Sequence, residues 1–159
     1  MLFRSMEPKK IYRTLKASVP VSYYTLPLDK ARIVKKGRDI TLVAYGAMVE
    51  VIQQAAQLAE AEGYDCEVID LMSLLPFDLE TLCASVEKTS RMVVVHEAPQ
   101  TCGHGAELIA AVQEQVFTKL AAPLQRVTGF DTPFPYTLEN HYMPTPERVL
   151  AAIEKAMNF

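Results

Sequence analysis

Tryptophan is absent from this 159-residue chain, and cysteine, histidine and glycine are scarce, with three, three and six residues. The cysteines Cys66, Cys83 and Cys102 form no CxxC pair, and an odd number cannot make a closed disulfide framework. The histidines show neither the HxxxH nor the HExxH spacing of a metal site. We therefore expect a chain from a reducing compartment, with neither a disulfide scaffold nor a metal site.

The chain also lacks an excess of positive charge and a long apolar run. Its formal net charge is -3 at pH 7, which argues against a nucleic-acid surface. The first ten residues lack the apolar core of a signal peptide, and no run approaches the length of a membrane span. We predict a soluble cytoplasmic protein with neither a nucleic-acid nor a membrane partner.

Short apolar segments alternate with segments of helical period, in a composition that is 50% hydrophobic and typical of one globular domain. Strands are predicted at 31–34, 40–45, 66–71, 92–95 and 124–128, and helices after Gly46, Asp78, Gly103 and Thr145. This alternation predicts a three-layer α/β/α fold around about five mostly parallel strands. The short turn at 35–37 predicts that the first two strands pair antiparallel.

Residues 1–30 differ in character from the predicted domain at 31–159. They contain Pro8, Pro20 and Pro27, mixed charges and little sustained period. Because proline removes ladder donors and restricts the preceding residue, this segment is expected to be an extended arm with at most short strand pieces. Such an arm needs a surface to lie against.

The stretch RMVVVHEAPQTCGHGAELIA, residues 91–110, contains most of the candidate site residues. Met92 to Val95 predict a strand buried on both faces, and a polar loop then leads to a helix that opens near Gly105. Gly103 and His104 at this helix start are able to present backbone N–H groups to an anion. The rest of a dinucleotide fingerprint is missing, so a plain connection is the alternative.

His96 and Glu97 at the end of the same strand suggest general acid–base chemistry. Neighbouring residues on a strand point to opposite faces, however, so the two do not form a pair without a bend. The structural alternative is that they hydrogen-bond within the loop or to a neighbouring subunit. Cys102 lacks an orienting partner and is interpreted as a small loop residue.

Two further features are candidates for contacts with partners. The long stretch at 129–144 carries four aromatic residues, which contact another chain or hold the loop on its own domain. Phe159 combines a ring with a free carboxylate that is able to bond to an arginine of a partner. A frayed terminus is the alternative for Phe159.

Several segments together resemble one known family. These are MEPKKIYR, DLMSLLPFDLETLCASVEKTSRMVVVHEAP, QTCGHGAELIA, RVTGFDTPFP and LENHYMPTPERVLAAIEKAMNF. In their order and spacing they resemble the C-terminal, transketolase-type domain of the β subunit in the E1 component of thiamine-diphosphate-dependent 2-oxo acid dehydrogenases. The resemblance runs from Met6 to Phe159 and implies a 2-oxoisovalerate (branched-chain), pyruvate or acetoin type of enzyme. It also implies the α/β fold predicted above.

The resemblance implies that an N-terminal pyrimidine-binding domain is absent from this chain and that residues 1–30 are the segment that leaves it. The parent enzyme is an oxidoreductase that uses thiamine diphosphate and Mg²⁺. None of the family's catalytic, cofactor-binding or metal positions transfers to these residues, so we expect the chain alone to be inactive and to bind no cofactor.

The implied partners are an E1 α subunit, a second β subunit and the subunit-binding domain of the E2 acyltransferase, which would dock near Phe159. In isolation the chain could form a homodimer, and in a eukaryote the location would be the mitochondrial matrix. The alternatives are an independent α/β binding module, or the equivalent domain of another thiamine enzyme such as transketolase.

Overall fold

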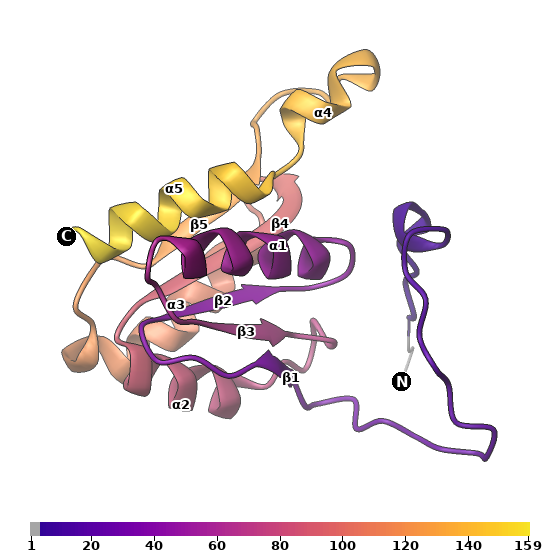
Figure 1. Cartoon of the computed structure of the whole chain (residues 1–159), viewed down its shortest axis with the longest axis horizontal. Helices are drawn as coiled ribbons and strands as arrows, with labels where there is room; N and C mark the ends of the chain where they lie inside the picture. Colours follow the sequence, from indigo (N-terminus) through magenta and orange to yellow (C-terminus); the bar gives the residue numbers. More distant parts are fainter. Residues whose placement is uncertain (1–3) are drawn as a thin grey trace.

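The computed structural model describes residues 4–159, so residues 1–3 of the predicted arm lie outside the described residues. A five-stranded sheet in the order β1-β3-β2-β4-β5 forms its centre (Figure 1). The strands are β1 (Arg32–Lys35), β2 (Ile40–Ala44), β3 (Cys66–Asp70), β4 (Met92–Pro99) and β5 (Gln125–Gly129). The helices are α1 (Met48–Ala61), α2 (Leu79–Thr89), α3 (His104–Val116), α4 (Glu139–Tyr142) and α5 (Pro146–Met157). Short 3-10 turns are η1 (Lys9–Ile11), η2 (Phe117–Lys119) and η3 (Tyr136–Leu138).

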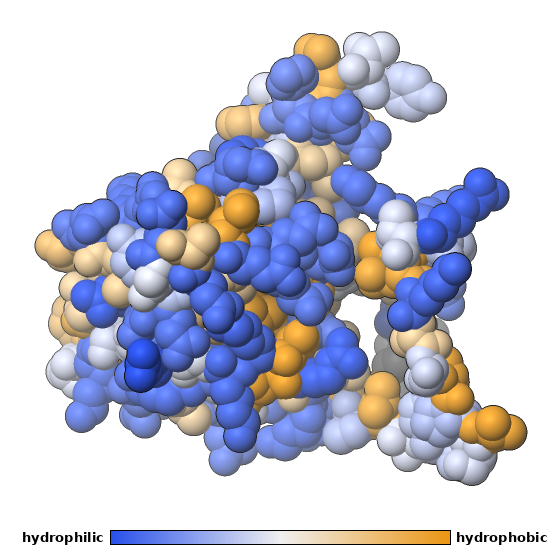
Figure 2. All heavy atoms as spheres, viewed as in Figure 1, coloured by the Kyte–Doolittle hydropathy of each residue, from blue (hydrophilic) through white to orange (hydrophobic). Residues whose placement is uncertain are grey.

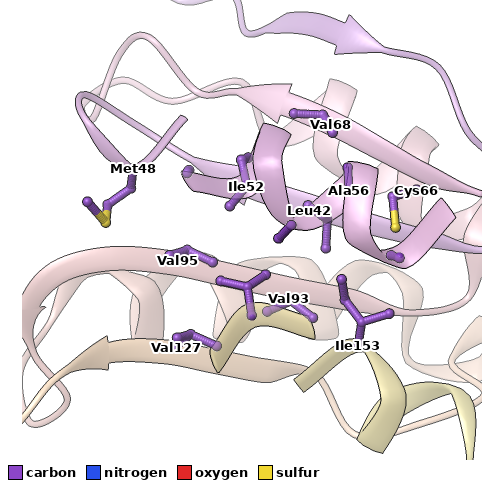
Figure 3. Close-up of a cluster of buried hydrophobic side chains, with 14 of the residues drawn as sticks. Leu42, Met48, Ile52, Ala56, Cys66, Val68, Val93, Val95, Val127 and Ile153 are labelled. Carbon is purple, nitrogen blue, oxygen red and sulfur yellow. The ribbon is translucent and has the colours of Figure 1, made fainter. Parts of the chain in front are cut away.

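Both faces of the sheet are covered, because alternate residues of each strand point to opposite sides. Leu42 packs under α1 and α5 with Ile52 and Ile153, as Figure 3 shows. Val43, the next residue, packs with Leu82 of α2 and with other buried residues under α2 and α3. This arrangement confirms the predicted three-layer α/β/α fold.

The pairing of β1 differs from the prediction. β1 is antiparallel, as expected, but it pairs with β3 and not with β2, which runs parallel to both β3 and β4. The connection between β1 and β2 crosses the end of β3 at Gly37, where a Cβ would lie 2.2 Å from the carbonyl carbon of Cys66. The short turn therefore passes over a neighbouring strand instead of closing a hairpin.

The predicted helix starts are confirmed in two places. Asp78 caps α2 by accepting the N–H of Thr81, and Thr145 caps α5 by accepting that of Arg148, with Pro146 in the first turn. On α1, Leu58 lies outside the buried face and is 40% exposed.

The described part of the arm, residues 4–30, contains η1 and no strand. Ile11 packs against the core under α1, whereas residues 12–30 are all exposed. Figure 1 shows the arm arching away from the domain on the side to which β2 and β3 point. Within residues 4–159, no helix has both the length and the apolar character needed to span a membrane.

Candidate functional site at the carboxyl edge of the sheet

The parallel strands end at one edge of the sheet, where α1 and α3 begin. In open α/β sheets this carboxyl edge is the usual place for a ligand or partner. Tyr45 follows β2 directly, His96 is the last buried residue of β4, and His104 is the first residue of α3. The sheet topology therefore brings together one tyrosine and two of the predicted site residues.

His96 is fully buried and stacks on Tyr45, with ring centroids 6.4 Å apart and 16° between the ring planes. Neither of its ring nitrogens has a hydrogen-bond partner among the described residues. No hydrogen bond of His96 with good geometry is present within its own loop among residues 4–159, although the backbone of Ala98 lies close enough to raise the pKa of the imidazole. Contact with a neighbouring subunit stays a prediction.

The two glycines beside His104 are explained by the ring of His96. A Cβ on Gly103 would lie 2.5 Å from Cε1 of His96, and one on Gly105 would lie 2.7 Å from its Nε2. Both distances are too short for real side chains. The imidazole therefore occupies the space beside the first turn of α3, and anion binding by Gly103 and His104 stays a prediction.

His104 lies half-buried between two aromatic rings. Its imidazole meets Tyr45 edge-on at 6.1 Å and Phe77 at 5.9 Å, and its buried Nε2 has no partner among residues 4–159. Burial lowers the pKa of His104, although Glu107 acts in the opposite direction. Burial also lowers the pKa of His96. The backbone of Ala98 acts in the opposite direction, and nearby Arg126 and His104 add to the lowering.

Glu97 points away from His96, as the alternation along a strand predicted. Its side chain is exposed, yet neighbouring atoms displace enough water to raise the pKa of the carboxyl, while Lys10 of the arm lowers it. No hydrogen bond in the described part of the chain joins Glu97 to His96. The two residues therefore do not form an acid–base pair.

The loop between β4 and α3 is held by polar contacts to β5 and to the β5–α5 connection. Thr101 donates its N–H and its hydroxyl to Asp131, at 2.9 and 2.7 Å, and Arg126 donates to the carbonyl of Gln100 at 3.0 Å. Cys102 is exposed and has a left-handed backbone with φ of 59°. No general base beside its thiol is evident, so Cys102 remains interpreted as a loop residue.

The described residues offer no cluster of three or more histidine, cysteine, aspartate or glutamate side chains that would suit a metal ion. Mg²⁺ that is bound to a diphosphate takes oxygen ligands from one or two carboxylates besides those of the phosphates. The unpartnered nitrogens of His96 and His104 face aromatic and glycine neighbours, and these do not supply such ligands.

Part of the aromatic stretch at 129–144 is held on its own domain, and contact with another chain stays a prediction. Tyr142 is buried and contacts Phe130 and Phe134 edge-on at 6.2 and 5.0 Å, so part of the loop is held on its own domain. Phe134 and Tyr136 remain 54% and 89% exposed. The stretch, predicted as irregular, also contains η3 and α4.

Arg148 fixes the base of this stretch, and no sequence pattern singled it out. Its guanidinium donates to the carbonyls of Thr128, Tyr142 and Met143 at 2.7, 3.3 and 3.2 Å, and lies 4.6 Å from the ring centre of Phe130. Burial lowers the pKa of Arg148. An arginine in the first turn of a helix after an aromatic loop is the only sequence signal for this contact.

Phe159 is 80% exposed. It follows α5, which runs against the direction of the parallel strands, so the C-terminus lies at the opposite end of the sheet from the arm (Figure 1). The structure therefore separates Phe159 from the cluster of His96, His104 and Tyr45.

A comparison with protein families identifies the domain. The model of the family described as "Transketolase, C-terminal domain" matches residues 29–149. The chain belongs to this family. The match includes β1 to β5 and the cluster around His96, and it begins at the junction between the arm and the sheet.

The similar curated proteins are β subunits of 2-oxo acid dehydrogenases, which confirms the resemblance seen in the sequence. The chain is 53% identical over 141 residues to the 2-oxoisovalerate dehydrogenase subunit beta of Pseudomonas aeruginosa, covering 89% of this chain and 39% of that protein. It is 48% identical over 152 residues to the mitochondrial 2-oxoisovalerate dehydrogenase subunit beta of Dictyostelium discoideum, covering 95% and 41%. For the pyruvate dehydrogenase E1 component subunit beta of Acholeplasma laidlawii, the identity is 45%, covering 94% and 46%.

One solved structure is similar in both fold and sequence. It is described as a split gene transketolase, an inactive beta4 tetramer, and has a TM-score of 0.72 at 31% identity, covering 89% of this chain and 47% of that one. This chain spans less than half the length of the relatives that it matches. The parts of those proteins outside the match have no counterpart in residues 1–159.

Proposed function

We propose that this chain acts as the C-terminal domain of an E1 β subunit in a 2-oxo acid dehydrogenase, where it supports subunit assembly and docking of E2. The observation that carries the proposal is the 53% identity over 89% of the chain to a 2-oxoisovalerate dehydrogenase β subunit. The two 2-oxoisovalerate relatives are more similar than the pyruvate relative, which favours a branched-chain 2-oxo acid as the parent enzyme's substrate.

In this role the domain contributes surfaces and no reacting group. Thiamine diphosphate with Mg²⁺ supplies the carbon chemistry of such an enzyme, and the cofactor would be held by parts of the assembly outside residues 1–159. His96 favours the neutral form inside the protein and is enclosed by its own domain. The chain alone is therefore expected to be inactive.

Two kinds of subunit contact follow from this proposal. An E1 α subunit and a second β subunit would pack on the domain, and the E2 subunit-binding domain would dock at Phe159. Phe159 supports the docking role because it offers an exposed ring at the end of α5, next to a carboxylate that suits an arginine of the partner.

A calorimetric titration of the chain with an isolated E2 subunit-binding domain tests the docking role. Deletion of Phe159 is expected to abolish binding. The matched control is Phe117→Ala, because Phe117 is a second exposed aromatic residue, 66% exposed, and its replacement should leave binding unchanged. A folded wild-type chain that does not bind, or equal losses in both variants, would contradict docking at Phe159.

A further inference from the structure

The side chain of Arg91 connects the start of β4 to the last turn of α5. Its Nε donates to the carbonyl oxygen of Ala156 at 3.0 Å, although the two residues are 65 positions apart in the sequence. Ala156 is only 1% exposed, and its carbonyl is one of those at the helix end that have no donor within the helix. Because a buried carbonyl without a partner is costly, Arg91 supplies a hydrogen bond that α5 needs at this point.

The backbone that carries Arg91 is itself held in place. The carbonyl of Arg91 accepts the N–H of Thr41 in β2 at 3.0 Å and the hydroxyl of Thr89 at 3.0 Å. The carbonyl of Ser90 accepts the N–H of Ala121, in the connection between α3 and β5, also at 3.0 Å. The guanidinium therefore projects from a fixed point, and its bond to α5 fixes the end of that helix relative to the sheet.

Phe159 lies a short distance along the chain from this bond. Only three residues separate it from Ala156, so its Cα stays within about 10 Å of the Cα of Ala156. Ile153 and Ala156 are buried in the core, whereas Phe159 is 80% exposed. Figure 2 shows hydrophobic atoms on the surface at this end of the molecule, where Figure 1 marks the C-terminus. The exposed ring is thus carried on a short segment that starts at the carbonyl held by Arg91.

Arg91 also brings a positive charge to the C-terminal end of α5, where a cation interacts favourably with the helix dipole. The basic residue of the last turn itself is Lys155, which is exposed. No hydrogen bond from Lys155 to the helix end is present among residues 4–159, so in this part of the chain the buried carbonyl of Ala156 depends on Arg91. The hydrogen bond and the charge of Arg91 are separate contributions that substitutions can distinguish.

We infer that Arg91 is a positioning residue for the docking of E2 at Phe159, and that it acts through its hydrogen bond to Ala156. This inference rests on the proposed function and adds a residue that acts through the last turn of α5. Helix ends fray when their terminal groups lack partners. A ring that is already held in place loses less conformational freedom on binding, and the affinity for the partner is correspondingly higher.

Two substitutions separate the hydrogen bond from the charge. Arg91→Met keeps an unbranched side chain but removes the donor. Arg91→Gln removes the charge but places an amide N–H at the same number of bonds from the backbone as Nε. The matched control is Arg38→Met, because Arg38 is 81% exposed and forms only surface ion pairs. Urea unfolding establishes that each variant is folded under the conditions of the measurements.

Nuclear magnetic resonance relaxation of the free chain tests the positioning without E2. The backbone amides of residues 156–158 should have order parameters of about 0.85 in the wild type, the value of a rigid backbone, and below about 0.6 in Arg91→Met. Arg91→Gln and Arg38→Met should resemble the wild type. Unchanged order parameters in folded Arg91→Met would overturn the inference, because the end of α5 would then not depend on Arg91.

Calorimetric titration with the isolated E2 subunit-binding domain then tests the effect on docking. Arg91→Met should bind about fivefold more weakly, because the terminal segment must be ordered on binding. Arg91→Gln should bind nearly as tightly as the wild type. Equal affinities of the wild type and Arg91→Met would overturn the inference, and so would equal losses in Arg91→Met and Arg91→Gln. A purely structural role would lower the free energy of unfolding and leave the affinity of the folded chain unchanged.

The wild-type titration separates this inference from the proposed function. If the wild type binds E2 and Arg91→Met binds equally well, docking stands and the positioning role of Arg91 is wrong. If the folded wild type does not bind, docking at Phe159 is wrong and the positioning role falls with it. Loss of order in Arg91→Met together with weaker binding, both restored in Arg91→Gln, is the result that we expect.

Discussion

The imidazole of His96 occupies the volume that a side chain at Gly105 would need. A Cβ at Gly105 would lie 2.7 Å from Nε2 of His96 and 3.3 Å from Cγ1 of Val94, and the buried imidazole stacks on Tyr45. The position of the His96 ring at the end of β4 thus requires a residue without a side chain at Gly105, in the first turn of α3.

Gly105→Ala is therefore expected to destabilise the fold. Overpacking costs about 1–3 kcal/mol, which exceeds the gain of about 1 kcal/mol in helix propensity. Urea unfolding measures the difference. In a His96→Ala background the obstacle is gone, so Gly105→Ala should become neutral or stabilising. An equal loss of stability in both backgrounds would show that His96 is not the cause.

Low pH should reduce the free energy of unfolding, because His96 is buried. Burial lowers the pKa of His96 in the folded chain, so below the ordinary value of about 6.5 the unfolded state binds more protons than the folded state. The free energy of unfolding should therefore be fully retained above that pH and fall as the pH drops toward the folded pKa. In His96→Gln, the free energy of unfolding measured with urea should depend less on pH between pH 7 and 5. This expectation holds for any effect of the substitution on stability at pH 7.

The control for the acid effect is His141→Gln, because His141 lies on the surface of α4. This substitution should leave the dependence of stability on pH nearly unchanged. His104, whose pKa burial also lowers, should account for part of the slope that remains in His96→Gln. An unaltered slope in His96→Gln would mean that the buried imidazole does not govern acid stability.

Arg148→Lys should loosen the segment after β5 despite the retained charge. A lysine cannot reproduce a planar guanidinium that bonds to the carbonyls of Thr128, Tyr142 and Met143, and we expect a loss of about 1–3 kcal/mol. Hydrogen exchange at residues 130–143 should become faster. Arg38→Lys is the control, because Arg38 is 81% exposed and forms only surface ion pairs, which contribute little.

The carboxylate of Asp78 has two structural roles, because it caps α2 and also accepts the N–H of Ala31. Burial alone would raise its pKa, but hydrogen bonds from Thr81 and Ala31 outweigh this and lower it. Asp78→Ala should cost about 1–2 kcal/mol, as the loss of a helix cap does. It should also increase proteolysis at residues 26–31. Asp29→Ala, which removes an exposed carboxylate nearby, should change neither measurement.

Local patterns were sufficient for most of the fold. The uninterrupted apolar run at 92–95 and the caps Asp78 and Thr145 predicted β4, α2 and α5, because they reflect burial and hydrogen bonding close in sequence. The pairing of β1 with β3 was missed, since it depends on Gly37 crossing a strand that comes later in the chain. No local pattern encodes such a crossing.

The sequence predicted where the candidate site lies, but it predicted fewer of the contacts that its residues make. The opposite orientations of His96 and Glu97 followed from strand alternation. The role of the two glycines did not, because the ring that requires them comes from the preceding strand. Arg148 was missed for a similar reason, since its partners are backbone carbonyls, and any sequence provides those.

The direction of α5 has a consequence for how the domain can be held. The helix starts near the carboxyl edge of the sheet and ends at Phe159, at the other side of the molecule, and its twelve residues span about 18 Å. A body docked at the carboxyl edge of the sheet and a body docked at the C-terminus would therefore not compete for space. The domain can serve as a spacer that keeps one macromolecule at a fixed distance from another while both are bound.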